Sequence, residues 1–269
     1  VETEAAEAVM RDIYRPLSLR EAPVMITTLE SAEIIKYAAN AFLAAKITFI
    51  NEIADLCEKV GGDVQAVAKG MGMGMDGRIG PKFLHPGPGY GGSCFPKDTM
   101  ALARIGQERA CPLKIVETII DVNERRKRAM AEKVFDVCGG SVNGKRIAVL
   151  GVTFKPDTDD MRESPALVVV PALVGGGGEV RVADPQGRKE GEALLPGVRW
   201  CEDAYEAAAE ADAVVLLTEW NEFRALDLGR LRQGMRGQAF ADLRNVYDPA
   251  DAQEAGFAYV SVGRAAVGL

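Results

Sequence analysis

The 269-residue chain contains a single histidine, His85. This count excludes a metal site built on two histidines, and any pairing of a nucleophile with histidine would have to use His85. Covalent chemistry would therefore depend on Lys, Asp or Asn for proton transfer. The five cysteines are scattered, odd in number and without a Cys-x-x-Cys pair. That usage argues against a disulfide framework or any zinc site and predicts a reducing, cytoplasmic location.

Long apolar runs and an excess of positive charge are also missing. The longest apolar stretch, ALVVVPALV at 166–174, is interrupted by Pro171 and falls short of the roughly 20 residues that span a bilayer. The formal net charge of −7 argues against a nucleic-acid surface. The basic run ERRKR at 124–128 is interpreted as a solvated helix face. We therefore expect neither a membrane nor a nucleic acid as partner.

The chain divides near residue 140 into two halves with different apolar periodicity. From 28 to 140 the apolar residues recur with a period near 3.6, which predicts helices. The first helix is long, because Thr28 can cap its start and Gly61 can end it, and it would span roughly 50 Å. Such a helix is typical of a spine between domains or subunits. Further helices are expected at about 63–70, 97–109 and 112–138.

After residue 140, short apolar runs alternate with helical segments. RIAVLGV at 146–152 is a continuous apolar run, typical of a buried parallel strand. This alternation predicts a doubly wound, Rossmann-like α/β domain. Ligands would bind at the carboxyl ends of its strands. Further strands are expected at 179–185, 198–200, 213–218, 239–243 and 258–262, with helices at about 164–174, 203–210, 227–233 and 249–255.

The first strand runs into a loop that lacks Gly-x-Gly-x-x-Gly, the pattern by which backbone N–H groups approach a pyrophosphate. The loop carries Lys155 and Arg162 instead. It indicates either a nucleotide-binding domain that meets phosphates through these cations, or two solvated surface charges. The residues alone leave both readings open.

Residues 85–98, HPGPGYGGSCFPKD, hold four glycines and three prolines, which indicates backbone placed against a ligand rather than a flexible surface loop. Cys94 would lie just before a helix that begins near Pro96. A helix N-terminus and the neighbouring Lys97 favour a thiolate, so Cys94 is the candidate nucleophile. The other four cysteines are interpreted as packing residues: Cys57, Cys111, Cys138 and Cys201.

Lys36 and Asn40 are four residues apart on the long helix and share a face. Aimed at a pocket, they could stabilise an oxyanion; alternatively they are a lysine with a solvated charge and a structural amide. Asp98, four residues after Cys94, could hold a water, or it could simply stabilise its helix through the dipole. Both choices stay open on the residues alone.

Four motifs follow one another over nearly the whole chain: EIIKYAANAFLAAKITFINE at 33–52, GRIGPKFL at 77–84, GPGYGGSCFPKD at 87–98 and GVTFKPDTDDMRESPA at 151–166. Together they resemble the UDP-glucose/GDP-mannose dehydrogenase family. The resemblance implies a helical dimerisation and catalytic domain at 28–140 and a UDP-sugar-binding domain at 141–269. Residues 1–27 would be the remnant of an N-terminal NAD-binding domain. The chain is therefore expected to be part of a longer enzyme and to be inactive alone.

The family's reaction, as the resemblance implies it, oxidises UDP-glucose to UDP-glucuronate in two NAD-dependent steps. Cys94 corresponds to the nucleophile that captures the C6 aldehyde as a thiohemiacetal, which becomes a thioester that water hydrolyses. Lys36 and Asn40 correspond to the residues that stabilise C6 oxyanions, and Asp98 to the one that assists the water. The contacts with NAD would come from Lys97 and Arg162.

The resemblance also implies a sugar site and a homodimer built on the long helix. The sugar site would comprise Lys36, Arg78, Phe83, Leu84, His85, Pro86, Gly87, Tyr90, Gly91, Phe95, Phe154, Lys155 and Arg244. Arg78 would cross from the neighbouring subunit. Phe95 and the stretch 90–92 favour UDP-glucose as substrate. The alternatives are a related dehydrogenase for GDP-mannose or UDP-N-acetylmannosamine, or a UDP-sugar-binding dimerisation fragment without activity.

Overall fold

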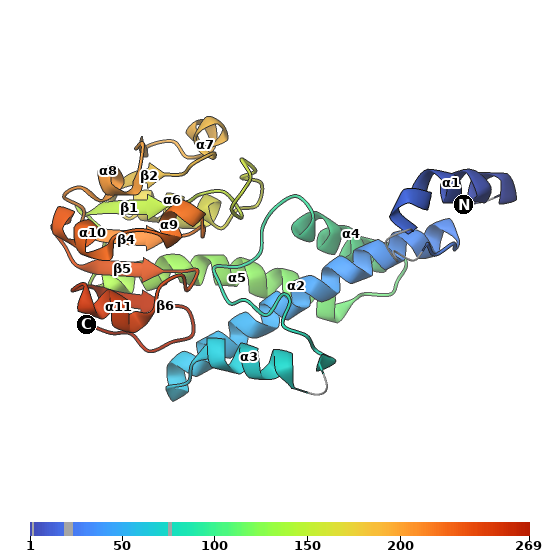
Figure 1. The fold of residues 1–269 in the computed structure, drawn as a ribbon, viewed down its shortest axis with the longest axis horizontal. Coiled ribbons are helices and arrows are strands. Elements are labelled where there is room, and N and C mark those ends of the chain that lie inside the picture. The colour runs from blue at the N-terminus through green and yellow to red at the C-terminus, as the bar shows by residue number, and fades with distance from the viewer. Residues whose placement is uncertain (2, 19–23, 75–76) are drawn as a thin grey trace.

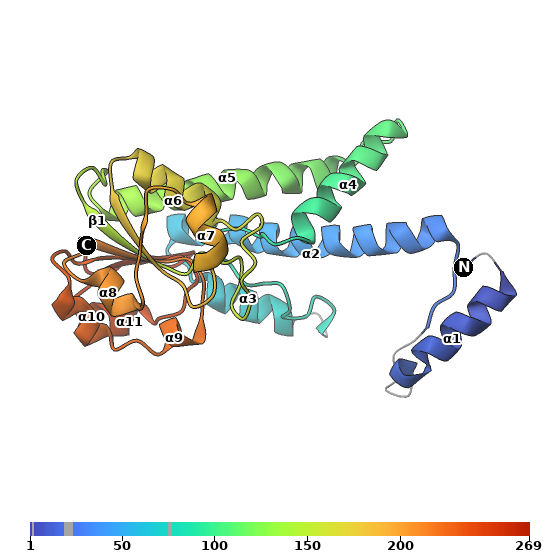
Figure 2. The same ribbon diagram turned by 90° about the horizontal axis from the view of Figure 1, so that it is seen from above.

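The computed structural model describes residues 1, 3–18, 24–74 and 77–269. Its N-terminal part is helical and consists of α1 (Glu4–Ser18), α2 (Leu29–Val60), α3 (Val64–Met73), α4 (Phe95–Glu108) and α5 (Lys114–Val137). Helix α2 packs against α3, α4 and α5, whereas α1 lies to the side of the N-terminal end of α2, away from the other helices (Figures 1 and 2). Within the expected remnant at 1–27, residues 2 and 19–23 lie outside the described residues.

The long helix α2 has the ends that its sequence predicts. The Thr28 side chain accepts a hydrogen bond from the Ser31 N–H at 3.2 Å, as an N-cap threonine does. Gly61 ends the helix with φ +76°, and its N–H donates to the Cys57 carbonyl. This left-handed conformation is one that glycine adopts without strain. The helix has 32 residues, so the expected length of roughly 50 Å is confirmed.

The C-terminal part is a parallel six-stranded sheet in the order β3-β2-β1-β4-β5-β6. Its strands are β1 (Arg146–Leu150), β2 (Glu179–Ala183), β3 (Arg199–Trp200), β4 (Ala213–Leu216), β5 (Ala239–Asp242) and β6 (Ala258–Ser261). The strand order reverses between β1 and β4, which is where ligands of such sheets bind. The predicted α/β fold class is therefore confirmed.

The helices between these strands are α6 (Ala166–Gly175), α7 (Arg188–Leu194), α8 (Ala204–Ala208), α9 (Asn221–Arg224), α10 (Leu228–Gly234) and α11 (Pro249–Glu254). Helices α7 and α9 were not expected from the sequence. Both are short, with seven and four residues, and their polar sequences carry little apolar periodicity.

The sheet is buried on both faces, and one of those faces joins the two parts of the molecule. Val149 and Val215 pack on one face in the same core cluster as Ile50 of α2 and Val64 of α3. Phe240 lies in the cluster on the other face, together with residues of α8, α10 and α11. Figure 2 shows α5 and α6 on one side of the sheet and α8, α10 and α11 on the other. The helical part therefore packs directly onto the sheet.

The basic run at 124–128 corrects one expectation, because it is not a uniformly solvated face. Arg126 and Lys127 are only 5% and 2% exposed, whereas Arg125 and Arg128 are exposed. Helix α5 packs against α2, α4 and α6 and also contacts β5 and β6. A helix with neighbours on so many sides buries part of its polar face as well as its apolar one.

The cysteines follow the expected pattern with one exception. Cys57, Cys138 and Cys201 are buried, and burial raises the pKa of the Cys138 and Cys201 thiols. Cys111 is exposed, so its interpretation as a packing residue is wrong. It lies in the turn between α4 and α5, where its N–H donates to the Gly106 carbonyl at 2.8 Å, and its side chain faces out of the core.

No helix in the described part of the chain is both long enough and apolar enough to cross a membrane.

Candidate active site

The glycine-rich loop (residues 85–94) meets the β1 loop (residues 151–165) where the helical part and the sheet come together. The Gly92 N–H donates to the Arg162 carbonyl at 2.8 Å. A Cβ atom on Gly91 would overlap a backbone carbonyl of the β1 loop, so no larger residue fits there without moving one of the loops. The two loops are therefore joined backbone to backbone.

A cavity of about 280 Å³ lies at this junction. It is lined by Ile47, Phe83, His85, Gly87, Gly89, Tyr90, Gly91, Phe95, Phe154, Lys155, Glu219 and Arg244. The structure thus brings together most of the residues that were assigned to the sugar site. Residues from α2, the glycine-rich loop, the β1 loop and the loops after β4 and β5 all contribute, so the cavity belongs to both parts of the molecule.

Four residues of the expected sugar site lie outside this lining. Leu84 is 3% exposed and packs in the hydrophobic core. Arg78 is exposed near the end of α3, and Pro86 is half-buried beside His85. Lys36 is hydrogen-bonded to Asp98 in the polar cluster described below.

Aromatic side chains form one wall of the cavity. The Phe95 ring lies 6.0 Å from that of Phe83 and 6.1 Å from that of Tyr90, measured between centroids. Phe83 has φ +65°, an uncommon and strained conformation for a bulky residue. Burial raises the pKa of Tyr90 to about 12, against an opposing hydrogen bond with Thr99, so its phenol stays protonated. The aromatic residues offer stacking surface.

Two cations, Lys155 and Arg244, also line the cavity. Arg244 donates from Nε to the Leu217 carbonyl at 2.7 Å and from Nη2 to the Phe154 carbonyl at 3.1 Å, and Glu219 lies 3.1 Å from its Nε. These bonds hold the guanidinium across the carboxyl ends of β1 and β4. The Lys155 ammonium lies 5.4 Å from the Phe154 ring. Two cations at a strand-end cavity suit an anionic ligand.

Cys94 occupies the N-cap position of α4, as expected. Its carbonyl accepts the Asp98 N–H at 2.9 Å, and Pro96 lies in the first turn of the helix. The thiol is exposed and lies 3.7 Å from the Ser93 hydroxyl. The helix start therefore presents a reachable sulfur beside the cavity wall that Phe95 forms.

Lys36, Asn40 and Asp98 form one polar cluster next to Cys94. Asp98 Oδ2 accepts hydrogen bonds from Lys36 Nζ at 2.7 Å and from Asn40 Nδ2 at 2.6 Å. The carboxylate is fully buried, and its other oxygen has no hydrogen-bond donor within the described residues. Thus α2 and α4 are joined by a carboxylate that also fixes the direction of both donors.

The charges of this cluster shift its titration. Burial raises the pKa of Asp98, but the hydrogen bonds from Lys36 and Asn40, with the charges of Lys36 and Lys97, outweigh it and lower that pKa below its usual range. The hydrogen bond to Asp98 raises the pKa of Lys36, and a charged Cys94 contributes to the same rise. The ammonium and carboxylate therefore stay charged beside the cysteine.

Two further cations lie on the open side of Cys94. Lys97 is exposed, with its Nζ 3.7 Å from Asp98 Oδ1. Arg162 is also exposed and makes a two-pronged pair with Asp160, at 2.9 Å for both bonds. That pairing raises the pKa of Arg162. Both are exposed charges on the two elements that meet near Cys94, α4 and the β1 loop.

The β1 loop does not fit a dinucleotide pyrophosphate. Asp184 Oδ2 accepts the N–H groups of Val152 at 2.6 Å and Thr153 at 3.1 Å, and these are the donors that would face a phosphate after β1. The chain's own carboxylate therefore fills the anion position. The N–H groups of Val152 and Thr153 are thus already hydrogen-bonded. This agrees with the lack of a Gly-x-Gly-x-x-Gly motif in the loop.

Several residues of the site were not singled out from the sequence. Ile47 and Glu219 line the cavity, and Glu219 belongs to the motif TEW at a strand end, where ligand contacts were expected. Asn51, Asn123 and Arg126 hydrogen-bond the backbone of the glycine-rich loop. They carry no local signal, because they lie on helix faces whose neighbours only the tertiary structure supplies.

Fold and site together define an α/β protein whose ligand cavity lies at strand ends, between a helical domain and a Rossmann-like sheet. The family model "UDP-glucose/GDP-mannose dehydrogenase family, central domain" matches residues 30–125, and the model "UDP-glucose/GDP-mannose dehydrogenase family, UDP binding domain" matches residues 148–249. Together they cover well over half of the chain. The chain belongs to the UDP-glucose/GDP-mannose dehydrogenase family.

Individual relatives agree with this assignment. UDP-glucose 6-dehydrogenase of Rhizobium meliloti (strain 1021) is 57% identical over 96% of this chain and 59% of its own length. UDP-glucose 6-dehydrogenase TuaD of Bacillus subtilis (strain 168) is 44% identical over 97% and 56%. The solved UDP-glucose dehydrogenase of Pyrobaculum islandicum superimposes with a TM-score of 0.86 at 34% identity, over 98% of this chain and 57% of that one. The chain thus spans less than two thirds of each relative.

Proposed function

We propose that this chain is the substrate-binding and covalent part of a UDP-glucose 6-dehydrogenase, which oxidises the C6 alcohol of UDP-glucose to the carboxylate of UDP-glucuronate. The observation that carries the proposal is the position of Cys94. Cys94 is the N-cap of α4, the helix that contributes Phe95 to the cavity and Asp98 to the cluster with Lys36 and Asn40. The printed activity of the relatives supports the same reaction.

Each residue near the thiol has a part in this reaction. Cys94 adds to the C6 aldehyde and forms a thiohemiacetal, and Lys36 and Asn40 donate to the oxygen that becomes negative. Two hydrides leave C6, one in each oxidation, and NAD would accept them. Water then hydrolyses the thioester that remains on Cys94. Asp98 Oδ1, which accepts no hydrogen bond among the described residues, is the acceptor that we assign to this water, while Oδ2 holds the two donors in place.

The cavity accounts for the rest of the substrate. Arg244 and Lys155 provide positive charge for the diphosphate, and the aromatic wall of Phe83, Tyr90 and Phe95 provides stacking surface for rings. Lys97 and Arg162 would meet the phosphates or ribose of NAD from the open side of Cys94. The dinucleotide itself would be held by another domain, because Asp184 fills the anion position of this sheet.

We also propose that two copies of the chain pair through α2. Phe42, Phe49 and Leu56 recur every seven residues along this helix and are 68%, 49% and 56% exposed. Phe49 also lines an apolar groove between α2 and α5, beside the 76% exposed Ile115. A stripe of large exposed apolar residues at this spacing suits a second helix.

The free cysteines of the chain fit a reducing cytoplasm.

Calorimetric titration of the chain with nucleotide sugars tests the proposal. We expect UDP-glucose to bind, and GDP-mannose and UDP-N-acetylmannosamine to bind at least tenfold more weakly. Arg244→Ala should raise the Kd for UDP-glucose at least tenfold, because it removes a cation that lines the cavity. Arg188→Ala, which removes an exposed arginine on α7, should leave the affinity unchanged. Absence of binding, or tighter binding of another nucleotide sugar, would contradict the proposed substrate.

A further inference from the structure

We propose that Asn123 and Arg126 of α5, together with Asn51 of α2, are positioning residues that set the shape of the glycine-rich loop for the nucleotide sugar. The inference rests on the proposed function, since the loop forms much of the cavity. None of these side chains lines the sugar cavity itself. They act on it through the backbone of two lining residues, Gly87 and Tyr90.

Asn123 holds Tyr90 at both of its backbone groups. Asn123 Oδ1 accepts the Tyr90 N–H at 2.8 Å, and its Nδ2 donates to the Tyr90 carbonyl at 3.1 Å. A carboxamide both donates and accepts, so it pairs with a peptide group as a neighbouring strand would. Asn123 is 3% exposed, and a Cβ on Gly89 would lie 2.9 Å from its Oδ1. The amide therefore fits closely under this part of the loop.

Gly87 is held in the same way by two other side chains. Its N–H donates to Asn51 Oδ1 at 2.8 Å, and its carbonyl accepts from Arg126 Nε at 3.0 Å. Asn51 and Arg126 are 3% and 5% exposed. The loop residues here belong to no helix or strand, so these side-chain bonds satisfy backbone groups that no ladder satisfies.

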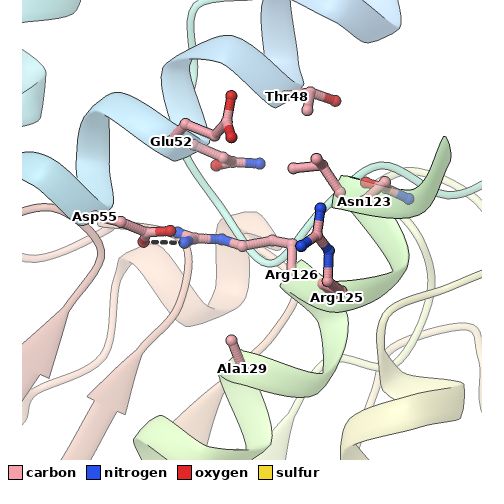
Figure 3. A pocket seen from close by; sticks show the side chains of 9 residues that line it. Thr48, Glu52, Asp55, Asn123, Arg125, Arg126 and Ala129 are labelled. Atoms are coloured by element: carbon pink, nitrogen blue, oxygen red, sulfur yellow. Dashed lines mark hydrogen bonds and ion pairs between the residues drawn. The ribbon is translucent and has the colours of Figure 1, made fainter. Parts of the chain in front are cut away.

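Arg126 is in turn oriented by Asp55, with which its Nη1 forms an ion pair. Figure 3 shows this pair at a recess between α2 and α5, with Asn123 on the same stretch of α5. The remaining nitrogen, Nη2, is buried without a partner among the described residues. Burying a guanidinium costs desolvation free energy. The bond from Arg126 to the Gly87 carbonyl is an interaction that an apolar side chain at this position could not make.

The four bonds fix the loop at two points, one on each side of Pro88. Between them lie the cavity-lining backbone of Gly89 and the turn that leads to Tyr90 and Gly91. A loop held in its bound shape before the ligand arrives loses less conformational entropy on binding. Removal of these bonds should therefore weaken the binding of UDP-glucose and make the loop more mobile, although none of the three side chains lines the cavity.

Three variants of the chain test the inference: Asn123→Ala, Asn123→Asp and, as control, Met130→Ala. Asp has the shape of Asn but lacks the donor for the Tyr90 carbonyl. Met130 lies seven residues further along α5, is 1% exposed and packs in the core away from the loop. Each variant is measured by calorimetry with UDP-glucose, by thermal unfolding, and by amide hydrogen exchange of residues 87–92.

We expect both Asn123 variants to raise the Kd for UDP-glucose at least tenfold. Asn123→Ala, which removes the acceptor for the Tyr90 N–H, should speed exchange of the Tyr90 amide at least tenfold, whereas Asn123→Asp keeps that acceptor and should leave this amide better protected than Asn123→Ala does. Met130→Ala should lower the melting temperature by as much or more, with Kd and loop exchange within twofold of the unsubstituted chain. Unchanged loop exchange in Asn123→Ala, or equal losses of affinity in Met130→Ala, would overturn the inference. If the unsubstituted chain binds no UDP-glucose, the proposed function is wrong. Hydrogen exchange of the loop in the Asn123 variants then shows by itself whether Asn123 holds the loop in shape.

Discussion

At the scale of single residues, the main feature is a carboxylate that serves two neighbours at once. Asp98 is fully buried and receives Lys36 and Asn40 on one oxygen. Both donors come from α2, while Asp98 comes from α4, 58 residues further along the chain than Asn40. The bonds therefore hold Lys36 and Asn40 in place before any substrate is present. Preorganisation of this kind is what the oxyanion-stabilising role that we propose for them requires.

The lowered pKa of Asp98 makes stability depend on pH. A group whose pKa is lower in the folded state stabilises it above its unfolded pKa of about 3.9, and this share is lost as pH falls through the folded value. Lys36, with a raised pKa, contributes below its unfolded value and loses its share only in strong alkali. Asp98→Asn should thus melt below the unsubstituted chain at pH 7, with the gap closing as the pH falls below about 4. A gap that stays constant over this range would contradict the assignment.

At the scale of elements, the glycine-rich loop depends on close backbone contact. Gly91 lies against the backbone of the β1 loop, and the Gly92 N–H donates to that same loop. Side chains from α2 and α5 hold the other end of the loop. The loop is therefore an organised element despite its lack of helix or strand.

Alanine substitutions at two glycines separate this contact from general effects of glycine. Gly91→Ala should destabilise the chain by about 1–3 kcal/mol, as overpacking does, and should lower its affinity for UDP-glucose. Gly70→Ala, in the interior of α3 with open space at its Cβ position, should stabilise by roughly 0.5–1 kcal/mol and leave binding unchanged. Urea unfolding and calorimetry measure both; a Gly91→Ala protein as stable and as tight-binding as the unsubstituted chain would refute the contact.

The helices and strands also show which features of the fold can be predicted from the sequence. The ends of α2 and the alternation of strands and helices were predictable, because caps and apolar periodicity are local properties. Cys94 at a helix start was predictable for the same reason. The burial of Arg126 and the exposure of Cys111 were not, since both depend on which neighbours the tertiary structure supplies. The role of Asn123 was hidden likewise, because its partner lies 33 residues away.

At the scale of the whole molecule, the cavity exists only because two parts share one core. Ile50 of α2 and Val215 of β4 belong to the same cluster, and Lys133 of α5 pairs with Glu58 of α2 at 2.7 Å beside it. The Gly263 N–H, just after β6, donates to the same Glu58. This packing keeps the glycine-rich loop and the strand-end loops in register with each other.

The exposed stripe on α2 leads to a prediction about assembly. Phe49→Glu places a charge in the middle of the apolar stripe and should convert a dimer into a monomer in sedimentation experiments at micromolar concentration. Leu194→Glu, at a 47% exposed apolar position on α7, should leave the dimer intact. A Phe49→Glu protein that still sediments as a dimer would place the subunit contact elsewhere.

The most direct test of the account asks whether sugar becomes bound to Cys94. The chain, joined to the NAD-binding domain that the proposal calls for, is mixed with UDP-glucose and NAD, quenched in acid during turnover, and digested for mass spectrometry. We predict a uronyl thioester on the peptide that contains Cys94. It should persist in Cys111→Ser, which removes the other exposed thiol, and disappear in Cys94→Ser together with UDP-glucuronate formation. Formation of UDP-glucuronate by Cys94→Ala at the unsubstituted rate would contradict the account.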